Sequence, residues 1–215
     1  MELRTAIEKR KTEKVLADAG SPWPIPDAEV RARVEQLLEL AAIAPFHKPA
    51  DESHRQEPLS SIVPWRFHVV DAEHCRKLIG KLDDVDKPSG KIPGMLAAAD
   101  ALVVATWLPN LAAETQEFQA FESTLQNMEH IAAASAAIQN LLLLAAEGGW
   151  KNYWSSGGVL RSEKVFQWLE IPLNQVLLGA IFLFPEDARD APVKPGSLRD
   201  RKGEVLQWSR WVAFE

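Results

Sequence analysis

The chain has 215 residues, 47% of them hydrophobic and 25% charged, which is typical of a soluble globular protein and predicts one domain over residues 1–215. The formal net charge of -6 argues against a nucleic-acid-binding protein. The longest apolar run, Leu141–Ala146, is too short for a membrane span, and the start lacks the apolar part of a signal peptide. The single cysteine, Cys75, excludes an internal disulfide. We therefore expect a cytoplasmic protein that does not contact a membrane.

The first half of the chain is rich in helical patterns. Its expected elements are, in order, a helix over residues 3–17, a proline-rich connector over 21–26, a helix over 27–45, a polar loop over 46–63, a strand over 66–71, a helix over 74–82 and a loop around 88–94. In the strand, Phe67 and Val69 alternate with Arg66 and His68, which is the period of two that a strand requires.

The second half contains the most apolar segments. Its expected elements are, in order, a buried strand over residues 101–108, a more exposed helix over 111–127, a buried helix over 130–146, a loop over 154–158, a short helix over 162–169, a buried strand over 176–184, and a tail whose end closes as a strand or an arm. The helix over 130–146 is apolar on nearly all sides and must be enclosed by a large core or by a second subunit. Few strands, without regular βαβ alternation, favour the α+β class.

Two small basic clusters in an acidic chain suggest a discrete anion site. Near the start, Arg10, Lys11 and Lys14 are suited to a phosphate, and Thr12 adds a hydroxyl donor. The alternative is a solvated helix face whose cations pair with neighbouring glutamates. Near the end stand Arg199, Arg201 and Lys202, and arginine suits bidentate phosphate recognition. The alternative there is a tail with its charges in solvent.

Two loops are further candidates for ligand contact. The segment Trp154-Ser155-Ser156-Gly157-Gly158 offers hydroxyls, backbone N–H groups and an indole wall to a planar polar ligand, or it forms a simple surface turn. His47 could contact a ligand or remain an ordinary polar loop residue. The chain has no GxSxG, HExxH, GxGxxG or GxxxxGK[ST] motif. We therefore expect no metal site and assign no catalytic side chain.

The order of these signals resembles the flavin-dependent nitroreductase family, in particular its small bacterial members with an A-P-x-H-K segment. The matching residues are Arg10-Lys11-Thr12, Ala44-Pro45, Pro64-Trp65, Phe67–Val70, Ala137–Leu141, Gly149 to Trp154, Ile171-Pro172, Gly179–Ile181 and Pro185. The resemblance covers essentially the whole chain. It implies an α+β fold with a central mixed β-sheet surrounded by helices, and an interlocked homodimer with FMN at its interface.

The resemblance also implies roles for individual residues. Arg10, Lys11, Thr12 and Lys14 would hold the FMN phosphate and ribityl chain, and Arg199 or Arg201 would add a phosphate contact. The other implied flavin contacts are His47, Trp154, Ser155, Ser156 and Gly157. Hydride would pass from NAD(P)H through the flavin to a nitro, quinone or related small-molecule acceptor, with the chemistry carried by the cofactor.

The chain departs from the family pattern at a few positions. Lys11, Thr12 and Lys14 stand where arginine, serine and arginine are usual, and the loop Phe46–Val63 is longer than in the family. These departures keep two alternatives open: a dehalogenating or flavin-cleaving enzyme of the same fold, and a non-catalytic flavin-binding or regulatory dimer.

Overall fold

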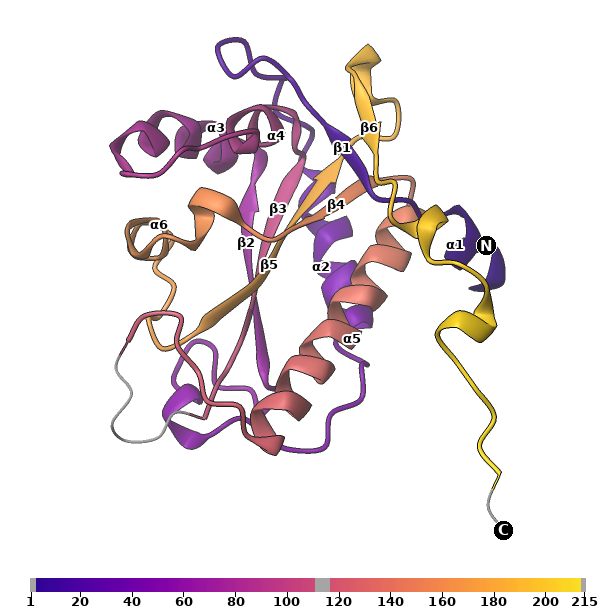
Figure 1. The fold of residues 1–215 in the computed structure, drawn as a ribbon. Coiled ribbons are helices and arrows are strands. Elements are labelled where there is room, and N and C mark those ends of the chain that lie inside the picture. Colours follow the sequence, from indigo (N-terminus) through magenta and orange to yellow (C-terminus); the bar gives the residue numbers. More distant parts are fainter. Residues whose placement is uncertain (1–2, 111–116, 214–215) are drawn as a thin grey trace.

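The computed structural model describes residues 3–110 and 117–213 (Figure 1). A four-stranded sheet lies at its centre in the order β2-β3-β5-β4, and all neighbouring strands in it are antiparallel. The strands are β1 (Glu13–Val15), β2 (Trp65–Asp71), β3 (Ala101–Trp107), β4 (Lys151–Ser155), β5 (Val176–Phe184) and β6 (Val193–Pro195). The short strands β1 and β6 form a separate antiparallel pair, and a parallel bridge from Thr12 to Asn152 joins that pair to β4.

Helices cover both faces of the central sheet, which confirms the α+β class. The α-helices are α1 (Leu3–Lys9), α2 (Glu29–Ala41), α3 (Ala72–Lys81), α4 (Ile92–Ala98), α5 (Leu125–Glu147) and α6 (Glu163–Trp168). The short 3-10 helices are η1 (Glu52–His54), η2 (Leu82–Asp84), η3 (Gly158–Arg161), η4 (Ala188–Asp190), η5 (Arg199–Arg201) and η6 (Val205–Gln207). Alternate residues of β3 face opposite sides: Ala101, Val103 and Ala105 pack against α2 and α5, whereas Leu102 and Val104 pack with the core of α3, α4 and α6.

Helix α5 is the longest element and runs diagonally across the sheet (Figure 1). The Thr124 hydroxyl caps its start by accepting a hydrogen bond from the Asn127 amide at 3.2 Å. By length and composition α5 is apolar enough to cross a membrane, yet its buried residues lie in the same core as the sheet. Its first turn is open to solvent, because Leu125 is 70% exposed and Met128 is 52% exposed.

The predicted helix over residues 3–17 is wrong beyond Lys9. Residues 13–15 form β1, in which Val15 is fully buried and pairs with Val193 from the far end of the chain. This long-range pairing overrides a local sequence that suits a helix. Two further expectations are also wrong: residues 92–98 form α4 rather than a loop, and Trp154 and Ser155 belong to β4 rather than to a loop.

The exposed helix expected over residues 111–127 is only partly open to comparison. Residues 111–116 lie outside the described residues, and residues 117–124 are not helical. Gln119 fixes this segment to β5: its side-chain oxygen accepts from the Leu177 amide at 2.9 Å, and its side-chain nitrogen donates to the Gln175 carbonyl at 3.1 Å. The segment is therefore anchored through side-chain bonds rather than helical ones.

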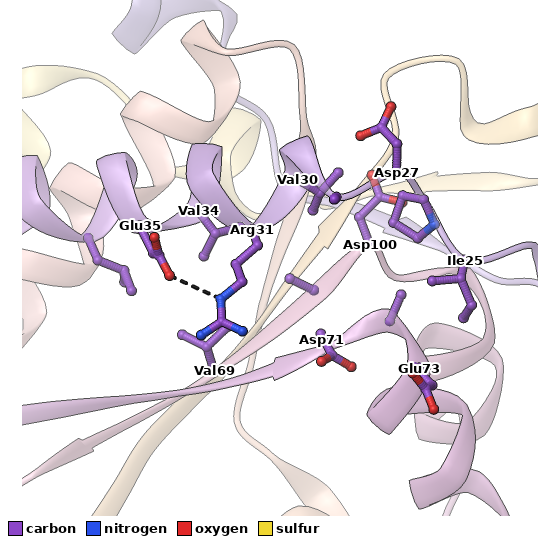
Figure 2. Close-up of a pocket in the computed structure, with 15 residues that line it drawn as sticks. Ile25, Asp27, Val30, Arg31, Val34, Glu35, Val69, Asp71, Glu73 and Asp100 are labelled. Carbon is purple, nitrogen blue, oxygen red and sulfur yellow. Dashed lines mark hydrogen bonds and ion pairs between the residues drawn. The ribbon is translucent and has the colours of Figure 1, made fainter. Parts of the chain in front are cut away.

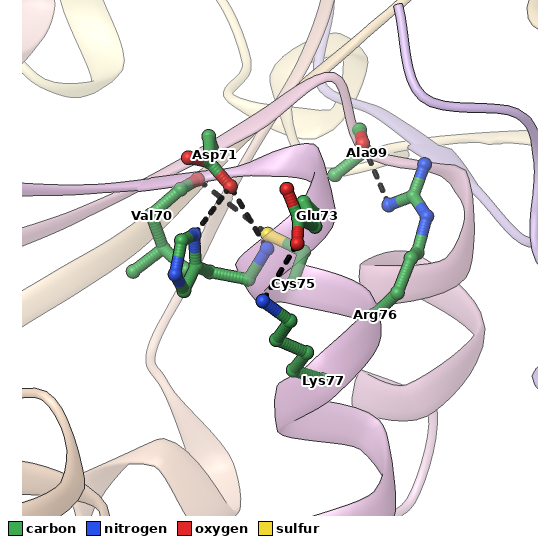
Figure 3. A network of polar contacts seen from close by, with 8 residues as sticks. Val70, Asp71, Glu73, Cys75, Arg76, Lys77 and Ala99 are labelled. Carbon is green, nitrogen blue, oxygen red and sulfur yellow. Dashed lines mark hydrogen bonds and ion pairs between the residues drawn. The ribbon is translucent and has the colours of Figure 1, made fainter.

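Cys75 has a structural environment. Its thiol is fully buried behind the start of α3, and Sγ lies 3.5 Å from the Val70 carbonyl oxygen (Figure 3). Burial raises the pKa of the Cys75 thiol to about 12. Asp71 caps the same helix by accepting from the His74 amide at 2.8 Å. A protonated, buried thiol is a poor nucleophile, as expected from the absence of a surrounding motif.

Candidate functional site

The N-terminal basic segment and the end of β4 enclose a cavity of about 630 Å³. The bridge between Thr12 and Asn152 places the basic segment beside β4, and the Lys14 ammonium lies 4.5 Å from the centre of the Tyr153 ring. The residues that line the cavity are Glu8, Lys11, Thr12, Tyr153, Trp154 and residues 195–200. The fold thus brings four of the predicted contacts, Lys11, Thr12, Trp154 and Arg199, to one cavity.

Trp154 forms one wall of this cavity, and a glycine on the neighbouring strand makes room for it. A Cβ atom added at Gly179 would lie 1.9 Å from Nε1 of Trp154 and 2.4 Å from its Cδ1. The indole therefore packs directly on the backbone of β5. An aromatic ring held in this way offers a fixed apolar surface to a planar ligand.

The cations around the cavity lack acidic partners. Within residues 3–110 and 117–213, the ion pairs shorter than 4.0 Å include none made by Arg10, Lys11, Lys14 or Arg199, and Glu8 pairs with Arg4 instead. The pKa of Arg10 is lowered, first by burial and then by the positive charge of Arg199. Two guanidinium groups that repel each other without a counter-ion are suited to a bound anion.

Arg199 also holds the tail against α1. Its Nη2 donates to the carbonyl oxygens of Ile7 at 3.2 Å and Glu8 at 3.0 Å, and its Nη1 donates to the carbonyl oxygen of Arg10. These bonds satisfy carbonyls at the C-terminal end of the helix. Arg201 does not line the cavity. Of the two candidate arginines in the tail, Arg199 is the one that lines the cavity.

The serine and glycine residues after Trp154 form a tight turn just beyond the cavity. The Ser155 hydroxyl accepts from the Gly157 amide at 3.2 Å, and Arg161 Nε donates to the Ser156 carbonyl at 2.7 Å. Gly157 has a φ of 105° and no space for a side chain, because a Cβ there would lie 2.5 Å from Cδ2 of Leu177. Ser155, Ser156 and Gly157 are not among the residues that line the 630 Å³ cavity.

His47 lies apart from the basic cluster. It is exposed and follows α2, where nearby Ala44 packs against α5 residues 133–137. Arg10 and Lys11 instead lie beside Ala146, at the other end of α5. Nine residues of helix separate Ala137 from Ala146, which is roughly 13 Å at 1.5 Å per residue. One copy of the chain therefore does not bring His47 to the cavity.

The long loop over residues 46–63 is packed around a buried arginine that the sequence pattern did not single out. Arg66 is only 4% exposed, and its terminal nitrogens donate to the carbonyl oxygens of His54, Ser61, Val63 and Trp65 at 2.7–2.9 Å. Burial lowers the pKa of Arg66. The loop and the start of β2 border a second cavity, of about 440 Å³. The available signal was the position of Arg66 between two aromatic residues, Trp65 and Phe67, at the start of a strand.

Comparison with known proteins agrees with this architecture. No family model matches the chain. The chain is 28% identical over 200 residues to "Putative NAD(P)H nitroreductase YfhC" of Bacillus subtilis (strain 168), a match that covers 85% of each protein.

Solved structures show the same fold. A nitroreductase-like family protein from Bacillus cereus superposes with a TM-score of 0.64 at 18% identity and covers 99% of this chain and 96% of its own. A nitroreductase with bound FMN from Bacteroides fragilis NCTC 9343 superposes with a TM-score of 0.56 at 16% identity, covering 95% of this chain and 98% of its own. The chain has the nitroreductase-like fold, and the resemblance seen in its sequence is confirmed.

Proposed function

We propose, from the nitroreductase-like fold and the cavity that Lys11, Arg199 and Trp154 border, that this protein is a cytoplasmic, single-domain FMN-dependent oxidoreductase. It would take hydride from NAD(P)H and pass it to a nitro, quinone or related small-molecule acceptor. The observation that carries the proposal is that Lys11 and Arg199, which form no ion pair among the described residues, line one cavity with the Trp154 indole. The name of the Bacillus subtilis relative and the FMN in the Bacteroides fragilis structure point the same way.

The residues at the cavity fit a flavin nucleotide. Lys11 supplies positive charge and Thr12 a hydroxyl for the phosphate end, while Arg199 adds charge and fixes the tail. Arg10 and Lys14 belong to the same segment but do not line this cavity, and would add charge from beside it. Trp154 would border the aromatic part. When bound, FMN supplies the two-electron chemistry, and the chain's own residues bind and orient it. No side chain is assigned as a general acid or base.

The experiment on function begins with colour. We expect the purified protein to be yellow and to release a chromophore that co-migrates with FMN. NADH or NADPH should bleach it under anaerobic conditions, and a nitroaromatic or quinone should restore the colour. A colourless protein that FMN cannot reconstitute would refute the proposal. A protein that holds FMN but is not reduced by either nucleotide would instead support the non-catalytic alternative.

We also propose an interlocked homodimer. The outer side of α5 exposes Leu125 and Met128, and the C-terminal tail, which extends away from the body (Figure 1), exposes Trp208 and Trp211, the latter by 98%. Strand β2 is an edge of the sheet with no partner on its outer side among the described residues. Exposed apolar surfaces of this kind commonly form protein–protein interfaces, and a second copy of the chain would bury them.

A groove beside the free edge of β2 supports this arrangement. The groove has a volume of about 520 Å³ and lies between α2, β2 and the start of α3, with Val34 and Val69 on its walls and Asp71 and Glu73 at one end (Figure 2). An arm with the apolar residues of the tail and the cation Arg210 would complement both its apolar and its acidic lining. A second copy would also be the source of His47 and Ser156 for the flavin site.

The dimer proposal is tested by mass. Because one chain weighs 23.9 kDa, we expect sedimentation at micromolar concentration to give twice that value. Removing residues 204–215 should shift the equilibrium toward the monomer without loss of far-ultraviolet circular dichroism, since the described part of this segment is exposed on its own chain. A full-length chain that sediments as a monomer at micromolar concentration contradicts the proposal.

A further inference from the structure

Asn152 is a buried side chain with one unsatisfied atom. It is 2% exposed, and its Nδ2 donates to the carbonyl oxygen of Leu142 at 3.3 Å. That bond fixes the orientation of the amide, because a carbonyl oxygen accepts only from the nitrogen side. Oδ1 then points the other way and has no hydrogen-bond partner among the described residues. A buried acceptor of this kind requires a donor within reach.

The donors near Asn152 are cations of the N-terminal segment. Asn152 lines a small cavity of about 130 Å³ together with Lys9, Arg10 and Lys11. Lys9 and Lys11 are exposed, whereas Arg10 is partly buried. Lys151 also lines the cavity, but its ammonium already donates to the Glu186 carbonyl at 2.6 Å.

Arg10 complements Asn152 in this cavity. No hydrogen bond or ion pair of the Arg10 side chain occurs within the described part of the chain, so a partly buried cation with free N–H donors shares a cavity with a free acceptor. A guanidinium can donate to an amide oxygen from one edge and to a phosphate from the other. The main chain of Arg10 is held close to Asn152, because Thr12, two residues further along, forms a β-bridge with Asn152.

We propose that Asn152 is a positioning residue: its side-chain oxygen accepts a hydrogen bond from the Arg10 guanidinium and so directs that group at the phosphate of a bound flavin nucleotide. This inference rests on the proposed function. It assigns to Asn152 no contact with the flavin itself. The consequence is that Asn152 affects the affinity for a phosphorylated flavin only through Arg10.

The test compares FMN with riboflavin, which lacks the phosphate. Dissociation constants of both are measured by flavin fluorescence for apoprotein of the wild type, Asn152→Leu, Arg10→Ala and the double variant. We expect Arg10→Ala to weaken FMN binding by about 10- to 100-fold, the range for a charged hydrogen bond, and Asn152→Leu by about 10-fold. Riboflavin affinity should stay within about 2-fold in both, and Asn152→Leu should have no further effect in the Arg10→Ala background.

Each other outcome has a definite meaning. If Asn152 has a purely structural role, Asn152→Leu should weaken the binding of FMN and riboflavin equally. If it acts independently of Arg10, the losses of FMN affinity should add in the double variant. Either result overturns the inference, as does an unchanged FMN affinity in Asn152→Leu. If Asn152→Leu does not fold, Asn152→Val, which suits a strand and also lacks the acceptor, replaces it. A wild-type protein that binds neither flavin refutes the proposed function, whereas one that prefers FMN regardless of Asn152 refutes this inference alone.

Discussion

Replacing Gly179 with alanine is expected to displace Trp154 and to lower the free energy of unfolding by about 1–3 kcal/mol or more, the usual range for overpacking a core. The added Cβ would lie 1.9 Å from Nε1 of Trp154, and no rotation of a methyl group relieves such a distance. Either the indole leaves the face of β5 or the strands β4 and β5 separate. Both changes alter the wall of the 630 Å³ cavity, so flavin affinity should fall as well.

A double variant identifies the cause. If the clash with the indole is responsible, Gly179→Ala should have little further effect on urea unfolding in a Trp154→Ala background. Gly80→Ala in α3 is the matched control: a Cβ added there would have nothing within 4 Å, so the change should leave stability unchanged or raise it by about 0.4–1 kcal/mol. An equal loss of stability from Gly179→Ala with and without Trp154 would rule out this steric account.

The elements that could be predicted from the sequence are those whose patterns are local. The apolar runs of β3 and β5 and the long helix α5 bury residues on most sides, and their composition showed this directly. Strands β1 and β6 could not be found in the same way. Each has three residues, and Val15 pairs with Val193 across about 180 positions of chain, so no local period marks either strand.

The candidate site was predictable to a similar degree. The cations and Trp154 stood out by residue type, and the fold brings Lys11, Thr12, Trp154 and Arg199 to one cavity. Asn152 did not stand out, because a single asparagine between a lysine and a tyrosine has no signal until its burial is known. His47 remains a prediction, because its place at a flavin site requires a second copy of the chain.

The loop over residues 46–63 gives the second large expected effect, through Arg66. Replacing Arg66 with methionine keeps much of the length of the side chain but removes the N–H donors from four carbonyl oxygens. Each buried carbonyl left without a partner destabilises the folded state by about 1–3 kcal/mol. The free-energy cost of four unsatisfied carbonyls is larger than the cost of opening the loop locally. We therefore expect the loop to open and expose its carbonyls to water.

The expected result is therefore local as well as global. We expect Arg66→Met to lower the free energy of unfolding by about 2–4 kcal/mol and to accelerate amide hydrogen exchange in residues 50–63, with the Ala50 amide, now bonded to the Ile62 carbonyl, as the clearest reporter. Arg55→Met is the control, because Arg55 donates to a single carbonyl, that of Ala50, and should lower stability by about 1 kcal/mol. Equal exchange in the two variants would show that Arg66 does not organise the loop. If exchange in Arg66→Met is faster only in the loop over residues 46–63, this long loop has a defined conformation in the wild type, and Arg66 on β2 maintains that conformation.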